Sequence, residues 1–156
     1  MTTGEERAAE ALAATGIEHV IVRHGPVTSL AEAAEARGVT PDRIIKTLVV
    51  RRAEDDYVFV LVPGDRQISW PKLRALLGVN RLSMPGADTA REVTGYERGT
   101  ITPFGSLTAW PVIADERVQG PVSIGAGAHG VAATVPGDEL IRVLGASVAD
   151  VTDPIE

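Results

Sequence analysis

The sequence predicts an α/β fold with a mixed, largely antiparallel sheet, barrel-like in form and surrounded by short helices. Three observations support this prediction. Runs of β-branched and aliphatic residues alternate with short helical segments along the whole chain. Several of the strand-like runs are joined by short turns, as hairpins are. The helical segments are bracketed by capping residues and glycines, so each of them is short.

Helices are predicted where alanine, leucine and charged residues lie between capping signals. Ser29 followed by Glu32 is a capping box, and Gly38 can end the helix that this box begins. Ser69 precedes another short helix with a proline in its first turn, and a single helical turn is expected after Thr40. The predicted helices cover residues 5–15, 30–37, 70–77, 88–93 and 136–144.

Strands are predicted where β-branched and aliphatic residues form short runs that end at turn residues. The runs at residues 44–50 and 57–62 are separated by a polar turn, which indicates a hairpin. Residues 95–105 have no period and are rich in glycine, which predicts a loop. The other predicted strands cover residues 19–23, 81–84, 111–118, 122–124, 131–135 and 148–151.

Length and composition are those of one globular domain that spans residues 1–156. The net charge of −6 excludes a generally basic surface, so a nucleic-acid partner would be gripped locally, at an end or in a pocket. The absence of cysteine excludes a thiol nucleophile, a thiolate metal site and disulfides. No stretch has the pattern of a signal peptide or a membrane span, so a cytoplasmic protein without a membrane partner is expected.

One lysine interrupts the apolar run at residues 44–50. Alternation places Lys46 on the same face as Leu48 and Val50, where an unpaired charge costs several kcal/mol. Only Lys46 and Lys72 are lysines among the 15 cationic side chains, so a compact point donor stands where the chain otherwise uses the planar fork of arginine. Lys46 is therefore either a cation that faces a ligand or a side chain that reaches solvent from a strand end.

A glycine-rich run at residues 125–130 matches the pattern G-x-G-x-x-G of dinucleotide-binding loops. Such a loop must open a helix, whereas β-branched residues and a Pro-Gly pair follow here. The run is therefore predicted to be a turn between two strands, in which Gly125 and Gly127 let backbone amides approach a ligand. His129 in this turn either contacts a substrate or is merely exposed. The three histidines lack metal-ligand spacing, so neither a metal nor a cofactor is expected.

The predicted loop at residues 95–105 is a second candidate for ligand binding. It combines glycines and a proline with few long side chains, a composition suited to presenting rigid backbone donors and acceptors to a small ligand. An ordinary surface connection can have the same composition, so the loop becomes informative only together with Lys46.

With Lys46 and this loop, the chain resembles the YbaK/prolyl-tRNA synthetase editing-domain family of free-standing aminoacyl-tRNA deacylases. The likeness covers roughly residues 12–151. It rests on the run Ile-Lys-Thr-Leu at residues 45–48, on residues 99–103, which fit the family's G-x-x-x-P loop, and on the glycine turn. Each motif is short, but their order and spacing together are fairly specific.

The resemblance implies a YbaK-like fold and hydrolysis of the ester that joins a wrong amino acid to the terminal adenosine of tRNA. Lys46 matches the family's essential lysine, so it is expected to be the catalytic residue and to hold carbonyl or phosphate oxygens. The family uses no protein nucleophile; the terminal ribose hydroxyl helps to orient or activate the attacking group. The residues implied in substrate binding are Thr47, Gly99, Thr100, Ile101, Thr102, Pro103, Phe104, Gly125, Gly127 and His129. The implied partners are the acceptor end of an aminoacyl-tRNA, proline tRNA first among them, and prolyl-tRNA synthetase.

Departures from the family pattern leave the amino acid open. Members that clear cysteinyl-tRNA have a tyrosine where this chain has Val22 and a serine near Gly125, and an aspartate is expected where it has Ala132. His129 is similar to a histidine of alanine-clearing relatives, but those have asparagine at the position of Thr47. Alanine, serine, threonine and cysteine are therefore all candidates.

Two other functions stay open. A non-catalytic module of the same fold would bind a tRNA end, a nucleotide or a protein partner, and the departures from the family pattern favour it. A small-molecule hydrolase would use the same pocket on other esters or amides. Neither the oligomeric state nor a physical association with a synthetase follows from the sequence.

Overall fold

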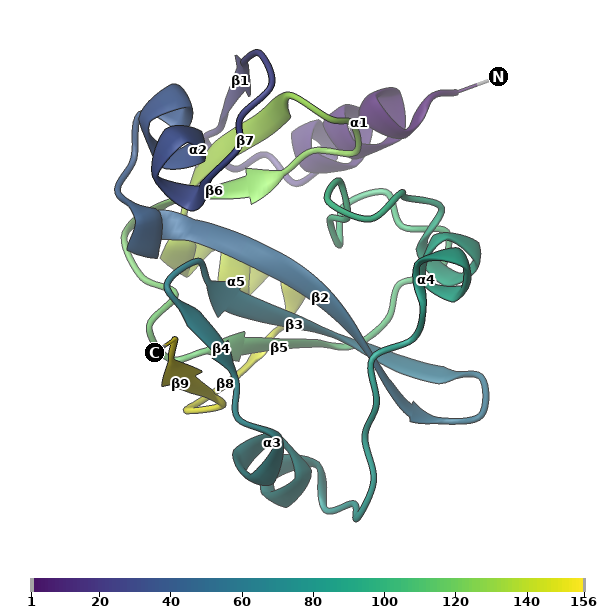
Figure 1. The fold of residues 1–156 in the computed structure, drawn as a ribbon. Coiled ribbons are helices and arrows are strands. Elements are labelled where there is room, and N and C mark those ends of the chain that lie inside the picture. The colour runs from purple at the N-terminus through teal and green to yellow at the C-terminus, as the bar shows by residue number, and fades with distance from the viewer. Residues whose placement is uncertain (1, 156) are drawn as a thin grey trace.

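The computed structural model describes residues 2–155, which form a seven-stranded sheet, a two-stranded sheet and short helices on both faces (Figure 1). The helices are α1 (Gly4–Ala14), α2 (Leu30–Arg37), α3 (Trp70–Leu77), α4 (Ala87–Thr94) and α5 (Gly137–Leu144), with a 3₁₀ turn, η1, at Pro41–Arg43. The strands are β1 (Val20–Arg23), β2 (Ile44–Ala53), β3 (Asp56–Pro63), β4 (Arg66–Ile68), β5 (Val112–Asp115), β6 (Pro121–Gly125), β7 (Val131–Pro136), β8 (Ser147–Ala149) and β9 (Thr152–Pro154).

The large sheet has the strand order β1-β7-β6-β2-β3-β5-β8, and the small sheet pairs β4 with β9. Among the described strands four pairings are antiparallel and three are parallel, which confirms the predicted mixed, largely antiparallel arrangement. The predicted barrel-like form is wrong, because the sheet is open. Its edge strands β1 and β8 are short and face solvent, with Val20 60% and Val148 50% exposed.

The predicted helices are all confirmed, and each end lies within one residue of its predicted position. The Ser29 hydroxyl accepts a hydrogen bond from the amide of Glu32 over 3.1 Å, and Ser69 caps α3 in the same way. Gly38 ends α2 in the left-handed conformation, with φ of +73°. The capping box differs in one detail: the Glu32 carboxylate accepts from the amide of Thr28, one residue before the cap, over 2.7 Å.

The predicted strand at residues 81–84 is wrong. In the described chain this segment meets β2 only through an isolated bridge between Ser83 and Arg51. Residues 111–118 are strand only as far as Asp115, because the amide of Arg117 turns back to bind the Asp115 carboxylate over 3.2 Å. The strands β4 and β9 are not predicted from the sequence; each is three residues long, and they pair with each other although they are far apart in the chain.

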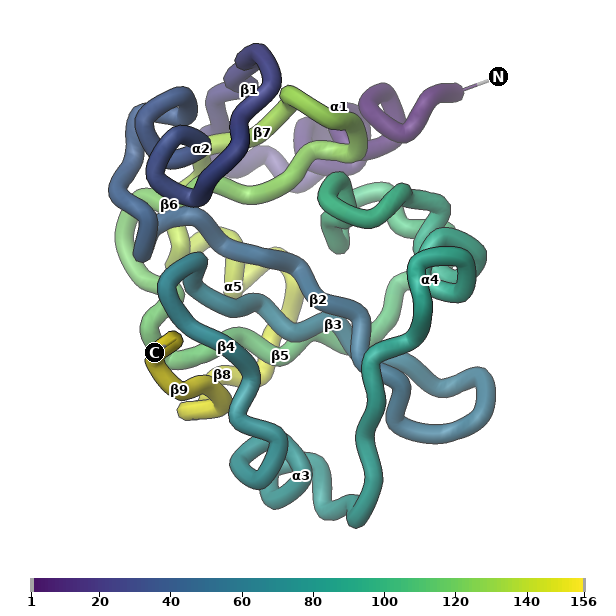
Figure 2. Tube along the Cα trace, viewed as in Figure 1, coloured from purple at the N-terminus to yellow at the C-terminus, as the bar shows by residue number. Residues whose placement is uncertain are grey.

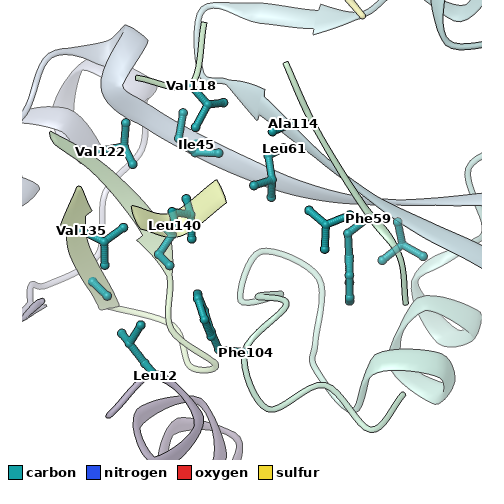
Figure 3. Packing of buried hydrophobic residues seen from close by; sticks show 14 of the residues in the cluster. Leu12, Ile45, Phe59, Leu61, Phe104, Ala114, Val118, Val122, Val135 and Leu140 are labelled. Atoms are coloured by element: carbon teal, nitrogen blue, oxygen red, sulfur yellow. The ribbon is translucent and has the colours of Figure 1, made fainter. Parts of the chain in front are cut away.

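The large sheet separates two clusters of buried apolar side chains. Alternation along β2 and β3 directs Val49 and Phe59 into one cluster and Val50 and Val60 into the other. The first cluster includes side chains of α1, α4 and α5 and also Phe104 (Figure 3). The second packs against α3 and the small sheet. Because both faces of β3 are covered, this strand is a continuous apolar run rather than an alternating one.

Candidate functional site

The loop at residues 95–105 lies between β2 and the turn that joins β6 to β7 (Figure 2). The strands β2 and β6 pair over only two residues each before they separate. Beyond that point the amide of Gly127 in the turn donates to the carbonyl oxygen of Thr100 in the loop over 3.0 Å. The structure therefore brings together the two glycine-rich segments that the sequence analysis selects for substrate binding.

Two glycines in the turn allow this close approach. Gly127 has φ of +85°, and a Cβ atom there would lie 2.4 Å from the carbonyl oxygen of Gly4. A Cβ atom at Gly125 would lie 3.0 Å from the carbonyl oxygen of Ile101. Side chains at these positions would push the loop or the start of α1 away from the turn.

Thr47 and the loop line a cavity of about 290 Å³, together with Arg98 and the segment that leads into α4. The Thr47 hydroxyl is buried and has no hydrogen-bond partner within residues 2–155. Gly99 and Ile101 also line the cavity, and within residues 2–155 their amides donate no hydrogen bond. Because buried polar groups are nearly always paired, the Thr47 hydroxyl indicates where a polar ligand would bind, and the amides of the exposed Gly99 and the half-buried Ile101 can also donate to it.

Lys46 lies on the opposite face of β2 from Thr47, because successive side chains of a strand alternate. Its Nζ donates to the carbonyl oxygen of Arg66 in β4 over 2.8 Å. Burial lowers the pKa of the Lys46 ammonium, and the nearby Asp65 carboxylate opposes part of this effect. An ammonium has three donors, and within residues 2–155 Lys46 uses one of them.

The sheet register aligns the three positions at which the chain departs from the resembling family. Val22 in β1 lies opposite Ala132 in β7, and Ala132 lies opposite Gly125 in β6. Paired residues share a face, and the register between β6 and β2 places this row on the face that carries Lys46. The three residues that differ from the family pattern are therefore neighbours in space. They form one row of small, apolar positions across β1, β7 and β6.

Three of the predicted substrate-binding side chains are engaged within the protein. The Thr100 hydroxyl donates to the carbonyl oxygen of Glu97 over 2.7 Å, and the Thr102 hydroxyl accepts from the amide of Phe104 over 3.3 Å. Phe104 lies in the apolar core (Figure 3). All three side chains are buried, and Pro103 is half-buried. These side chains hold the shape of the loop, and apart from Arg98 the polar groups that the loop offers to the cavity belong to its main chain.

His129 extends from the turn toward the loop. Its side chain is 70% exposed, and its Nε2 lies 3.5 Å from the Glu97 carboxylate. A Cβ atom on Gly99 would lie 3.6 Å from the imidazole ring. The ring therefore borders the loop from the solvent side, where it can reach a ligand bound to the loop.

Arg37 is a candidate that the sequence analysis misses, because the last turn of a polar helix gives no signal of its own. Its guanidinium Nη1 lies 3.5 Å from the hydroxyl of Ser123 in β6, and its Nε is buried without a partner within residues 2–155. Burial lowers the pKa of the Arg37 guanidinium. Ser123 shares a face with Lys46, so two half-buried cations face the same side of the sheet.

The histidines are not grouped. His19 and His24 each lie within hydrogen-bond distance of a backbone carbonyl oxygen close in sequence. Within residues 2–155 no three His, Cys, Asp or Glu side chains are grouped as a metal site would require. None of the helices described here has the length and apolar character needed to cross a membrane.

Residues 24–143 match the family model of the aminoacyl-tRNA editing domain. The proline–tRNA ligase of Heliobacterium modesticaldum is 39% identical over 105 residues, which are 67% of this chain and 17% of that enzyme. The corresponding enzyme of Lactobacillus gasseri is 35% identical over 96 residues, with shares of 62% and 17%. The chain thus spans less than a fifth of either relative. A solved structure described as a candidate trans-editing enzyme for prolyl-tRNA synthetase is similar over 98% of this chain and 99% of that one, with a TM-score of 0.86 and 26% identity.

Proposed function

The chain belongs to the aminoacyl-tRNA editing domain family, and from this premise we propose that it is a trans-editing deacylase. It would hydrolyse the ester that joins a small, wrongly attached amino acid to the terminal adenosine of a tRNA. The observation that carries the proposal is the cavity lined by Thr47, whose hydroxyl is buried and unpaired within residues 2–155, and by Gly99 and Ile101 of the loop, whose amides donate no hydrogen bond there.

The size of the cavity supports a small amino acid as the substrate. A synthetase distinguishes substrates that differ by one methylene by only about 1–3 kcal/mol, so smaller amino acids are mischarged and must be removed at a second site. Such a site works by admitting only what is small. A volume of about 290 Å³ is at the lower end for ligand pockets, which suits a side chain the size of alanine, serine, threonine or cysteine.

The loop amides suit the chemistry of ester hydrolysis. A water oxygen adds to the ester carbonyl, negative charge builds on the carbonyl oxygen, and the ribose oxygen then leaves with a proton. Backbone N–H groups aimed at that oxygen stabilise the charge, and loss of one such donor costs about 10²–10³-fold in rate. The amides of Gly99 and Ile101 would serve this purpose, and a neighbouring ribose hydroxyl would orient the water, so that no protein nucleophile is required.

Lys46 and Arg37 would hold the nucleotide part of the substrate. Both are half-buried cations on the same side of the sheet, and both keep donors that the described protein does not use. Guanidinium and ammonium groups of this kind bind phosphate or carbonyl oxygens strongly, because the surroundings screen them less than water does. Lys46 would hold these oxygens from the face of β2 opposite Thr47, and the carbonyl of Arg66 would position Lys46.

Proline tRNA is the proposed substrate, and prolyl-tRNA synthetase is the proposed partner. The support comes from the relatives: two proline–tRNA ligases carry the matching region, and the similar solved structure is described in terms of prolyl-tRNA synthetase. A separate chain with this fold would hydrolyse mischarged tRNA after the synthetase has released it, which is what editing in trans means.

The proposal is tested with proline tRNA charged separately with alanine, serine, threonine, cysteine and proline. We expect the protein to release one of the small amino acids and to spare prolyl-tRNA. Release of prolyl groups at a comparable rate would contradict an editing role. If no amino acid is released from proline tRNA or from other charged tRNAs, the deacylase assignment fails.

A non-catalytic module that binds a tRNA end is the second candidate. It is favoured by the row of Val22, Ala132 and Gly125, which stands where the resembling family has polar side chains. Titration with uncharged tRNA separates the two functions. Tight binding without turnover of any aminoacyl-tRNA would favour the module, whereas turnover would exclude it.

Replacing Thr47 by valine is expected to weaken catalysis without weakening the fold. The hydroxyl is buried and unpaired within the described residues, so its loss should leave the melting temperature unchanged or higher, whereas a lost substrate hydrogen bond should lower kcat/KM about 3–10-fold. Thr100→Val is the matched control, because that hydroxyl binds the carbonyl of Glu97 and its loss should lower stability. An unchanged kcat/KM for Thr47→Val would show that this hydroxyl does not contact substrate.

A further inference from the structure

A second cavity, of about 610 Å³, lies between the β2–β3 hairpin and α3. It is lined by four arginines and by no acidic residue, and we call it the arginine groove; the arginines are Arg51, Arg52, Arg74 and Arg81. Four of the 15 cationic side chains of the sequence are thus gathered at one place in a chain whose net charge is −6. A local concentration of positive charge on an acidic protein favours an anionic ligand there.

Most of this charge is not neutralised by the protein. Arg52 forms an ion pair with Asp56, with Nε 3.0 Å from the carboxylate. The Nε of Arg51 donates only to a backbone carbonyl, over 3.3 Å. The side chains of Arg74 and Arg81 form no hydrogen bond or ion pair within residues 2–155. Guanidinium forks with unused donors match the geometry of phosphate oxygens.

The arginine groove leads toward the Thr47 cavity along the same two stretches of chain. The strand β2 contributes residues 47–49 to the cavity and 51–53 to the groove, and the segment between α3 and α4 contributes 84–87 and 80–83. Two backbone hydrogen bonds of 2.8 and 3.2 Å between Arg51 and Ser83 fix that segment on the strand. Figure 1 shows it running from α3 past the hairpin to α4.

The spacing fits a polymer that occupies both places. An extended strand advances about 3.3 Å per residue, so Arg51 lies about 13 Å along β2 from Thr47. This is the length of a few nucleotides. A free amino acid or a mononucleotide is too short to fill the cavity and reach the arginines at the same time.

We propose that the arginine groove binds the sugar–phosphate backbone of the tRNA, a few nucleotides away from the esterified adenosine. The inference rests on the proposed function of the Thr47 cavity as the ester site. A net charge of −6 disfavours RNA binding by the surface in general, so a tRNA needs local sites of opposite charge, and the arginine groove is such a site in addition to Lys46 and Arg37. Backbone contacts give affinity and orientation without sequence information, and the choice of amino acid remains with the cavity.

The test compares wild type with the double variant Arg74→Gln/Arg81→Gln. These two side chains form no hydrogen bond or ion pair within residues 2–155, so the variant should fold normally. We expect its affinity for uncharged proline tRNA to fall about tenfold or more at low salt, and the slope of log affinity against log salt to become less negative by about 2. Hydrolysis of an aminoacyl ester of adenosine alone should be unchanged, because this substrate carries no phosphate that could reach the groove.

The double variant Arg43→Gln/Arg142→Gln is the matched control, since it removes the same charge at arginines outside the groove. An equal loss of tRNA affinity in this control would indicate a general charge effect and would overturn the inference. Wild-type affinity and salt slope in the groove variant would overturn it as well. Loss of adenosine monophosphate binding with unchanged tRNA affinity would assign the groove to a small phosphate ligand instead.

The inference and the proposed function can fail separately. If wild type binds uncharged tRNA through the groove but cleaves no charged tRNA, the deacylase assignment falls and the groove stands. If wild type releases an amino acid from tRNA and the groove variant does so with unchanged affinity and rate, the groove falls and the deacylase assignment stands.

Discussion

Replacing Lys46 by alanine should reduce the release of the wrong amino acid from tRNA by about 100-fold or more while the protein stays folded. The half-buried ammonium is a charged donor held in place by the carbonyl of Arg66, and charged donors at a reacting site are worth several kcal/mol. Its loss costs the fold little, because a net hydrogen bond contributes only about 1 kcal/mol and removal of the charge also removes its desolvation cost.

Two further variants distinguish the roles that Lys46 could have. Lys46→Met keeps most of the side-chain volume and should behave like Lys46→Ala in rate but like wild type in melting temperature. Lys46→Arg keeps the charge but replaces a compact donor with a planar fork, so only partial activity is expected. Single-turnover deacylation and thermal unfolding are the measurements. A Lys46→Ala protein that cleaves at the wild-type rate would remove this lysine from the mechanism.

The local structure of this chain is predictable where neighbouring residues determine it. Ser29 and Gly38 bracket α2 because a hydroxyl can bind the first amides of a helix and a glycine can adopt the left-handed conformation that ends it. The hairpin of β2 and β3 follows in the same way from two apolar runs and a polar turn. These are short-range effects, and a single sequence contains all of them.

Pairings between distant segments are not predictable in this way. The strands β4 and β9 contain charged residues and a proline, and they become strands only because the fold brings residues 66–68 beside 152–154. The false strand at residues 81–84 is the converse case: its composition suits a strand, but it meets β2 at Ser83 alone in the described chain. A propensity of a few tenths of a kcal/mol per residue decides neither case, because tertiary context outweighs it.

In the candidate site, too, some residues can be predicted from local motifs and others depend on contacts between distant segments. Lys46, the loop and the glycine turn are recognisable as short motifs, and the structure brings the loop and the turn into contact. Alternation along the strand predicts that Lys46 and Thr47 lie on opposite faces of β2. It does not predict which segments pack against each face. Arg37 and the arginine groove depend on segments far apart in sequence, and no local pattern distinguishes their arginines from solvated ones.

A buried polar network connects the anchor of Lys46 to the end of the chain. The Lys46 ammonium donates to the carbonyl of Arg66, and the Arg66 guanidinium donates to the Thr152 hydroxyl over 2.7 Å. That hydroxyl donates to the Asp115 carboxylate over 2.9 Å, which also accepts from the amide of Val151 over 3.2 Å. Asp115 is completely buried, so it fixes β9, and through β9 the strand β4 that positions Lys46.

Asp115→Ala should therefore be the most destabilising of the substitutions considered. It leaves the buried Val151 amide and Thr152 hydroxyl without their acceptor, and each buried polar group left unpaired costs about 1–3 kcal/mol. For a chain of this size the melting temperature should fall by about 10 °C. Asp115→Asn keeps the shape and one acceptor, so its melting temperature should lie between those of alanine and wild type.

The same substitutions test whether the network supports the site. Below its melting temperature Asp115→Asn should be folded but should deacylate more slowly. The reason is that the Arg66 carbonyl, which holds Lys46, is positioned through the bonds of Arg66 to Thr152 and of Thr152 to Asp115. Glu139→Gln is the control, since this exposed carboxylate pairs only with Arg142 in the described chain and its loss should leave the melting temperature nearly unchanged. If Asp115→Asn melts lower but deacylates like wild type, the network serves stability alone. If Asp115→Ala melts within about 1 °C of wild type, the buried carboxylate does not hold β9 and β4 in place.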